Sequence, residues 1–345
     1  MPAISFRKRL VFGAVAIVVA MALPLLALEI FLRIGTRSLF LVPTSGLIVE
    51  SGVPGLGYRL AANYSQGTIL TDEFGFRRPP QPRPLARRSI LLLGDSVAFG
   101  GGVPYEAGLG AILENQLSRD LGQQIAVWNA AVPGYNSVQE SILFEDLRKK
   151  VKPDLVMVEF CMNDYLEPVT LTPSGKLDTT ESPNPRISLT SVLYRSRAVF
   201  FLKEEIKNLE KLHPEWFPVP LHYIHHIQKR PGWRNAKNAI RQIANISRQM
   251  HVPFLLVIFP VEQQLRIHDR APQADLVAFA QSEGISVLDL YSCMVGHWRE
   301  HLFFDFSVEE RVVDKIHLSR RGHVLAGREI AAGILRDPVL RSALQ

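Results

Sequence analysis

The sequence predicts an α/β protein whose core is a parallel sheet of five strands with helices on both faces, preceded by one N-terminal transmembrane helix. From residue 89 onward, short runs rich in leucine and β-branched residues alternate with segments of helical periodicity. This alternation is typical of parallel sheets, because each crossover between parallel strands needs a connection about as long as a helix. One uncharged apolar stretch near the N-terminus lies outside this pattern and has the length of a membrane span.

The predicted strands are short apolar runs without period-2 alternation, which is the pattern of strands buried on both faces. The first of them ends in Gly94-Asp95-Ser96, a polar turn directly after four apolar residues. From the sequence, the five strands comprise residues 90–93, 125–128, 155–160, 253–259 and 285–290.

Helix boundaries are predicted from caps and stop signals between these strands. Gly122 follows a run of leucines at helical spacing and is expected to end that helix. Ser137 with Glu140 three residues later has the form of a capping box. Ser319 is the expected N-cap of the last helix. The predicted helices are residues 109–121, one from 137, one through 236–244, one from about 272, and one from 319 to about 335.

The N-terminal stretch at residues 10–28 contains no charged residue over 19 positions, close to the roughly 20 residues that cross a bilayer as a helix. Three basic residues at positions 7–9 precede it, so the tip is expected to stay in the cytoplasm and the rest of the chain outside. A cleaved signal peptide is the alternative, since residues 20–22 have the small-x-small form of a cleavage site. The apolar run continues past that site, which favours an uncleaved anchor within residues 1–34.

Three further segments complete the predicted organisation. Residues 35–88 are rich in glycine, proline and polar residues and are expected to form an irregular approach segment on the edge of the domain. The domain itself is predicted at residues 89–340, with an insertion at about 165–235 over the rim of the site. Five arginines lie between residues 77 and 88, but four prolines interrupt them, so a solvated linker is favoured over a nucleic-acid-binding surface.

Neither the cysteines nor the histidines predict a metal or cofactor site. Cys161 and Cys293 are too few for a disulfide framework and are expected to be free, mostly buried thiols. His222, His225 and His226 can share a helical face as metal ligands do, but no carboxylate or cysteine lies beside them at ligand spacing. We therefore expect no metal and no cofactor.

Polar residues follow three of the predicted strands at their carboxyl ends. Ser96, Gly134 and Asn163 come from separate parts of the chain, and ligands of parallel sheets bind at this edge. A serine hydroxyl is a poor nucleophile until a base takes its proton, and the usual base is an imidazole held by a carboxylate. Asp314 and His317, three residues apart near the C-terminus, can supply both groups.

Taken in order, these motifs resemble the SGNH/GDSL hydrolase family. Its blocks correspond here to Gly94-Asp95-Ser96, Gly134, Asn163-Asp164 and Asp314-x-x-His317, spread over residues 70–335. The chain is most similar to membrane-anchored bacterial members, in which a segment like residues 72–77 precedes the first block. Two departures stand out: Val97 replaces a leucine, and Cys161 replaces a glycine whose loss is expected to narrow the substrate pocket.

The resemblance implies a flavodoxin-like three-layer sandwich and a role for each site residue. Ser96 attacks an ester carbonyl, His317 takes its proton and later returns it to the leaving alcohol, and Asp314 orients the imidazole. The backbone N–H groups of Ser96 and Gly134 and the side-chain amide of Asn163 would form the oxyanion hole.

The expected function is therefore that of a membrane-anchored serine esterase of the bacterial inner membrane, with its domain periplasmic or extracellular. Its substrate is expected to be a carboxylic ester, with O-acyl groups on sugars as the leading candidate. Two alternatives stay open: an O-acyltransferase for envelope polysaccharide that uses the same triad, and a non-catalytic binding module on the same fold. No nucleic-acid partner is expected, and the sequence does not determine the oligomeric state.

Overall fold

The computed structural model describes residues 46–171, 227–305 and 313–345 as continuous segments. It also describes short stretches and single positions between them, namely 12, 20, 22–31, 177–178, 196, 198–199, 202, 206, 209, 213 and 216. The chain divides into two compact units. The first comprises residues 1–40, 182–221 and 306–313, and the second comprises residues 41–181, 222–305 and 314–345.

Within the first unit, the described part is chiefly a helical stretch at residues 22–31. Its Glu29 carboxylate accepts hydrogen bonds from the Ser196 hydroxyl at 2.7 Å and the Ala198 N–H at 2.8 Å. No helix among the described residues is both long and apolar enough to span a bilayer. Most of the span predicted within residues 1–34 lies outside the described residues, and so do His222, His225 and His226.

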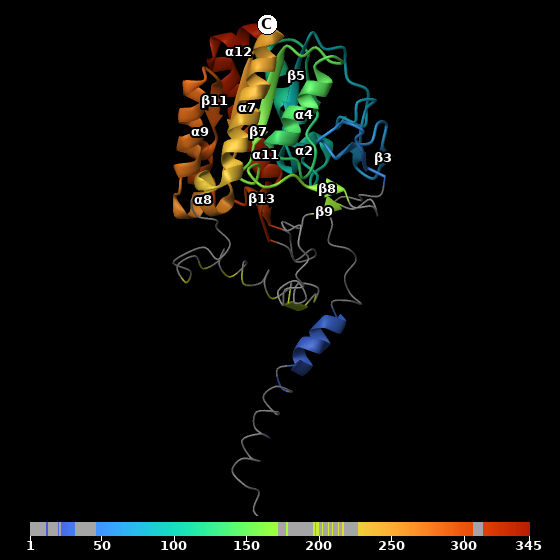
Figure 1. Cartoon of the computed structure of the whole chain (residues 1–345), viewed down its shortest axis with the longest axis vertical. Coiled ribbons are helices and arrows are strands. Elements are labelled where there is room, and N and C mark those ends of the chain that lie inside the picture. Colours follow the sequence, from blue (N-terminus) through green and yellow to red (C-terminus); the bar gives the residue numbers. More distant parts are fainter. Residues whose placement is uncertain are drawn as a thin grey trace, which may run out of the picture. The chain divides into compact units, whose positions relative to one another are not determined.

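A five-stranded parallel sheet forms the centre of the second unit, as predicted (Figure 1). Its strands are β5 (Arg88–Leu93), β6 (Ile125–Asn129), β7 (Leu155–Phe160), β10 (Phe254–Ile258) and β11 (Ser286–Asp289). They lie in the order β11-β10-β7-β5-β6, and every neighbouring pair is parallel. Counted along the chain, this is the 2-1-3-4-5 order of flavodoxin-like sheets.

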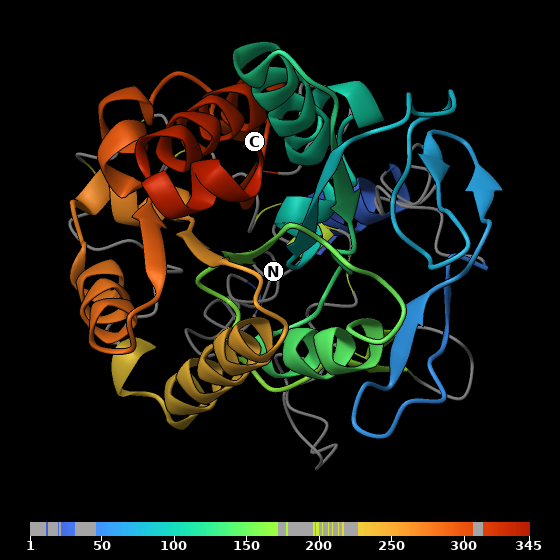
Figure 2. The same ribbon diagram turned by 90° about the horizontal axis from the view of Figure 1, so that it is seen from above.

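Helices cover both faces of this sheet (Figure 2). On one face α4 (Ser137–Leu147) packs against α7 (Pro231–Gln249), and on the other α3 (Leu109–Leu121) packs against α11 (Arg320–Arg336). The other helices described in the second unit are α2 (Ser96–Phe99), α8 (Glu262–Ile267), α9 (Ala271–Ser282), α10 (Tyr291–Met294) and α12 (Pro338–Ala343). Its described 3-10 turns are η1 (Tyr105–Ala107), η3 (Ile227–Lys229) and η4 (Val295–His297).

Most predicted boundaries agree with the structure to within one or two residues, because the caps are local. Gly122 ends α3 in the left-handed conformation at φ 65°, and the Ser319 hydroxyl caps α11 by accepting the Gly322 N–H at 3.2 Å. The capping box at Ser137 is wrong. The cap of α4 is Asn136, whose side chain accepts the Gln139 N–H at 3.0 Å, and Glu140 is buried instead of reaching back to the cap.

The segment before the sheet contains two antiparallel pairs rather than wholly irregular chain. Strand β1 (Ile48–Glu50) pairs with β2 (Tyr58–Leu60), and β3 (Ser65–Gln66) pairs with β4 (Ile69–Leu70). Further short strands occur later, namely β8 (Thr170–Leu171) with β9 (Leu177–Asp178), and β12 (Phe303–Asp305) with β13 (Val313–Leu318).

The arginine-rich segment is the predicted solvated linker only in part. Residues 80–82, 84, 85 and 87 are exposed, but two of its arginines are attached to the domain. Arg77 is buried, and Arg83 pairs with Glu114 at 3.3 Å and donates a hydrogen bond to the Val127 carbonyl at 2.8 Å. The guanidinium groups of Arg77 and Arg83 attach the segment to the domain. Cys161 and Cys293 are free thiols, the first buried and the second partly exposed, as expected.

Candidate active site

Ser96 begins the four-residue helix α2 directly after β5, at the carboxyl edge of the sheet. The turn between them depends on Gly94, whose φ of 156° disfavours other residues. A Cβ atom at this position would also lie 2.8 Å from a Glu159 carboxyl oxygen and 2.8 Å from the Ala98 Cβ. The glycine therefore allows the backbone to turn sharply against β7 and leaves the serine at the tip.

Two carboxyl groups hold the N-terminal end of α2. Asp95 is its N-cap, with one oxygen accepting the Val97 N–H at 2.7 Å. Glu159, on the neighbouring strand β7, lies near the Asp95 N–H at 3.4 Å and the Ala98 N–H at 3.3 Å with one carboxyl oxygen. Both side chains are fully buried. Together they fix the first turn of the helix on which the serine lies.

Arg77 holds the opposite end of the same helix. Its guanidinium donates to the carbonyls of Phe99 at 2.5 Å, Gly100 at 2.6 Å and Val103 at 2.7 Å. A cation at a helix C-terminus satisfies carbonyls that have no partner in the helix. A four-residue helix is too short to be stable alone. Its position therefore depends on these contacts from the chain on either side.

The imidazole of His317 lies against the Ser96 hydroxyl, with Nε2 and Oγ 2.7 Å apart. His317 lies on β13, 221 residues away in the chain, and both side chains are partly exposed. A neutral imidazole whose proton is on Nδ1 can accept the serine proton at Nε2. The pair is within the range for proton transfer without any rearrangement.

Asp314 lies on the same strand as His317, but its side chain is outside the described part of the chain. The structure therefore neither joins it to the imidazole nor separates it.

His323, one turn into α11, is buried. Burial lowers its pKa to about 3, and the charges of Arg77 and His317 contribute to this shift. It is thus neutral in the folded protein.

Backbone and amide donors surround the serine. Among the described residues, the N–H groups of Ser96 and Gly134 have no hydrogen-bond acceptor. The loop that carries Gly134 is attached to the serine turn by the Val132 N–H, which donates to the Gly94 carbonyl at 3.0 Å. The Asn163 side-chain amide donates to Asp95 at 2.8 Å, which leaves its second N–H available. The structure therefore brings these three predicted residues around one turn.

Asp164 closes the turn that carries Asn163. Its carboxyl group accepts the Cys161 N–H at 3.1 Å, and its own N–H donates to the Cys161 carbonyl at 3.1 Å. This double contact just after β7 places Asn163 at the tip of the turn, facing Asp95.

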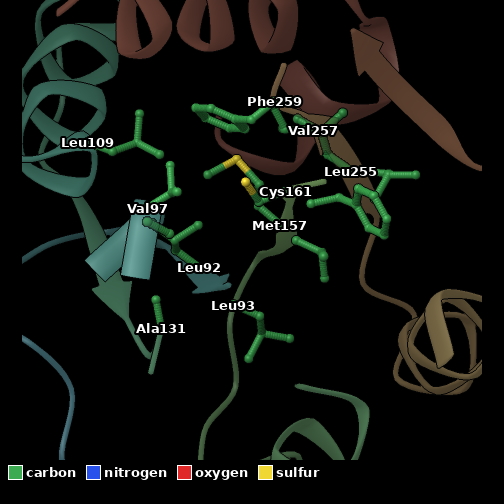
Figure 3. Packing of buried hydrophobic residues seen from close by; sticks show 14 of the residues in the cluster. Leu92, Leu93, Val97, Leu109, Ala131, Met157, Cys161, Leu255, Val257 and Phe259 are labelled. Carbon is green, nitrogen blue, oxygen red and sulfur yellow. The ribbon is translucent and has the colours of Figure 1, made fainter. Parts of the chain in front are cut away.

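Cys161 does not narrow the substrate site as its replacement of glycine led us to expect. Its side chain is only 1% exposed and packs in the hydrophobic core, where Figure 3 shows it among Met157, Val257 and Phe259. Burial and the nearby carboxyl groups of Asp95 and Glu159 raise the pKa of its thiol. The cysteine is thus a core residue with an un-ionised thiol.

Three acids around Asp95 are fully buried, and each has a raised pKa. Burial raises the pKa of Glu140, and the charges of Glu159 and Asp95 raise it further. The pKa of Glu159 is raised by burial and by Asp95 and Asp164, and that of Asp164 by burial and by Glu140 and Asp95. Burial and the neighbouring carboxyl groups thus both favour the protonated form of each acid.

Replacing Glu140 with glutamine is expected to stabilise the protein at pH 8 and to leave it nearly unchanged at pH 4. The unfolded chain releases the Glu140 proton near its ordinary pKa of 4.5, whereas the raised pKa in the folded protein shifts this release to higher pH. Stability is therefore lost as the pH rises above this value, and glutamine removes the loss. Thermal unfolding at both pH values measures the effect, at about 2–4 °C for each kcal/mol recovered.

Glu145→Gln, on the same helix, is the control for losing a carboxylate from α4, where Glu145 pairs with Arg148 at 2.8 Å. An equal gain for Glu140→Gln at pH 4 and pH 8 would contradict the assignment, because the effect would then be unrelated to proton release.

Sequence reasoning missed three residues that position the site. Glu159 had a signal, since it is a single carboxylate in a strand that is otherwise apolar. Arg77 had a weaker signal, because it lies in the segment at residues 72–77 that resembles the one preceding the first block in membrane-anchored members of the family. Tyr58 had none, because its hydroxyl contacts the Pro133 carbonyl, 75 residues away, at 2.8 Å.

The profile of the GDSL-like lipase/acylhydrolase family matches residues 92–325. No curated protein sequence matches the chain significantly.

Several solved structures are similar to the chain at low identity. One is a G-D-S-L family lipolytic protein from Desulfitobacterium hafniense, with 15% identity over 72% of this chain and 99% of that one and a TM-score of 0.42. The esterase EstA from Pseudoalteromonas has 12% identity over 72% and 97% of the two chains, with a TM-score of 0.42. The acetylxylan esterase Axe2 from Geobacillus stearothermophilus has 14% identity over 73% and 94%, also with a TM-score of 0.42.

Proposed function

The chain belongs to the GDSL-like lipase/acylhydrolase family and is a hydrolase acting on esters, and we propose that Ser96 is its nucleophile and His317 its general base. The observation that carries this proposal is the 2.7 Å contact between the Ser96 hydroxyl and the His317 imidazole. Serine acyl transfer requires a base in contact with the serine hydroxyl, and a neutral imidazole is the usual base.

In the first half of the reaction, the Ser96 oxygen bonds to the ester carbonyl carbon while His317 takes the hydroxyl proton. The carbonyl oxygen becomes an oxyanion, stabilised by the N–H groups of Ser96 and Gly134 and by the Asn163 amide. As the oxyanion collapses, the bond to the alcohol breaks and His317 returns the proton to the leaving oxygen. Asp314 is assigned to orient the imidazole and to stabilise its charged form.

In the second half, water attacks the acyl-serine and His317 takes its proton. The carboxylic acid leaves, and the proton returns to Ser96. An acceptor hydroxyl on a sugar in place of water would give transfer rather than hydrolysis, with the same residues in the same roles. We assign hydrolysis of carboxylic esters, with O-acyl groups on sugars as the proposed natural substrates.

The proposal includes attachment to the bacterial inner membrane by the apolar stretch at residues 10–28, with the domain outside the cytoplasm. Support for it is confined to the sequence, where the uncharged length and the preceding basic residues are typical of such anchors.

One experiment tests both parts of the proposal. The full chain and its Ser96→Ala variant are expressed, membranes are separated from the soluble fraction, and both fractions are assayed with p-nitrophenyl acetate. We expect hydrolysis by the wild type in the membrane fraction and background hydrolysis by the variant. Incubation with an acetylated glycan then measures free acetate as the product of hydrolysis.

Each outcome bears on a different claim. Equal rates for the wild type and Ser96→Ala would refute the assigned nucleophile. Activity confined to the soluble fraction would refute the anchor and leave the site assignment standing. Acetyl groups that pass to an added glycan without release of acetate would replace hydrolysis with transfer.

A further inference from the structure

Tyr58 contacts the loop that carries Gly134, although it lies in the approach segment, outside the residues that match the family. Its hydroxyl donates to the Pro133 carbonyl at 2.8 Å, and its side chain is fully buried. The contact is tight, because a Cβ atom at Gly134 would lie 2.8 Å from the Tyr58 hydroxyl. The N-terminal segment is thus packed directly against the peptide that precedes Gly134.

This peptide is the central one of a β-turn. Pro133 and Gly134 are its middle residues, the Tyr135 N–H donates to the Val132 carbonyl at 3.1 Å, and Gly134 has a φ of 84°. Proline followed by a residue with positive φ is the pattern of a type II turn. In type I and type II turns the central peptide points in opposite directions, so the turn type decides where the Gly134 N–H points.

We propose that Tyr58 is a positioning residue for the oxyanion hole, which it serves by holding the Pro133–Gly134 peptide in the type II orientation. In a planar trans peptide the carbonyl and the N–H point to opposite sides. A hydrogen bond on the Pro133 carbonyl therefore directs the Gly134 N–H away from Tyr58. It also polarises the amide and makes the N–H a stronger donor. This inference rests on the proposed function, in which Gly134 supplies one oxyanion donor.

The surroundings keep the tyrosine in its donor form. Burial raises the pKa of Tyr58, and the negative charge of Asp95 raises it further. The hydroxyl therefore keeps its proton at neutral pH and can donate the hydrogen bond.

Tyr135 provides a matched control for the test. Its hydroxyl donates to the Tyr58 carbonyl, and the two rings contact each other edge to face with centroids 5.1 Å apart. Tyr135→Phe therefore removes one buried hydrogen bond between the same two segments, as Tyr58→Phe does, but leaves the Pro133 carbonyl bonded. A role confined to stability predicts similar effects of the two changes.

We expect Tyr58→Phe to lower kcat for p-nitrophenyl acetate about tenfold with KM changed less than twofold, since the lost contact acts on the transition state. Tyr135→Phe is expected to keep kcat within about twofold. It is expected to lower the unfolding temperature by about as much as Tyr58→Phe does. Equal losses of kcat in the two variants, or an effect on KM alone, would overturn the inference.

A second measurement monitors the Pro133–Gly134 peptide directly by NMR. The chain contains three Pro-Gly pairs, at residues 54–55, 133–134 and 231–232. With ¹³C-carbonyl proline and ¹⁵N-glycine labels, each pair gives one cross-peak in a carbonyl–amide NMR spectrum. Tyr58→Phe is expected to displace the 133–134 peak much more than the 231–232 peak.

The two measurements separate the possible failures. An unmoved 133–134 peak would overturn the role of Tyr58, whatever the activity. Equal hydrolysis by the wild type and Ser96→Ala would instead refute the proposed function, and the NMR result would still report the orientation of the peptide.

Discussion

Alanine in place of Ser96 is expected to reduce kcat for ester hydrolysis by about 10⁴- to 10⁶-fold, the largest effect of any single change in this chain. The expectation follows from the contact between the Ser96 hydroxyl and His317 and from the absence of covalent catalysis once the hydroxyl is lost. His317→Ala is expected to have an effect of similar size, because an unactivated hydroxyl is a weak nucleophile at neutral pH.

The double variant gives the sharper test. When two residues act in one step, removing both costs about as much as removing either one. Ser96→Ala/His317→Ala should therefore hydrolyse p-nitrophenyl acetate at nearly the rate of either single variant. His297→Ala, at an exposed histidine, is the control and should retain wild-type activity. Losses that multiply in the double variant would show that the two residues act independently, contrary to the assignment.

After changes at Ser96 and His317, removal of the Asn163 amide is expected to have the largest effect, lowering kcat about 100- to 1000-fold with little change in KM. Asp95 accepts one amide N–H at 2.8 Å and thereby orients the side chain. The other N–H is the proposed oxyanion donor. Its hydrogen bond to the substrate carbonyl oxygen strengthens most in the transition state, when negative charge develops on that oxygen. Steady-state kinetics of Asn163→Ala with p-nitrophenyl acetate measures both constants.

Asn163→Asp is the matched variant, since it keeps the shape of the side chain and removes the donors. It also places a carboxyl group against Asp95, so we expect a loss at least as large as that of alanine. If Asn163→Ala instead raised KM and left kcat intact, the amide would serve substrate binding and not the oxyanion. Near-wild-type activity of Asn163→Asp would exclude the amide as a donor.

Much of the fold followed from local patterns. The stop at Gly122 and the cap at Ser319 depend on neighbouring residues only, and the structure has both where the sequence indicated them. The error at α4 has a local cause as well, because Asn136 and Ser137 are both good caps and the pattern favoured the wrong one. Glu140 was misassigned for the same reason, and the structure places it in the core.

Local sequence patterns did not predict the long-range contacts. The arginine segment looked solvated because its composition is polar and proline-rich, yet Arg77 is buried against the carbonyls at the end of α2. Cys161 was expected in the substrate site because a family motif has glycine there, but its thiol lies in the core. In both cases the prediction failed because it depended on which way a side chain points, and packing alone determines that direction.

The sequence by itself determined the succession of strands and helices along the chain and identified Ser96, His317 and Asn163 as candidate site residues, because periodicity, caps and short motifs are encoded within a few residues. Only the tertiary structure decided that Ser96 and His317 are in contact, that Glu159 and Arg77 hold the serine helix at its two ends, and that Tyr58 contacts the peptide before Gly134. The physical reason is that these contacts join residues 22 to 221 positions apart in the chain, and such contacts form only when the sheet and its covering segments pack together.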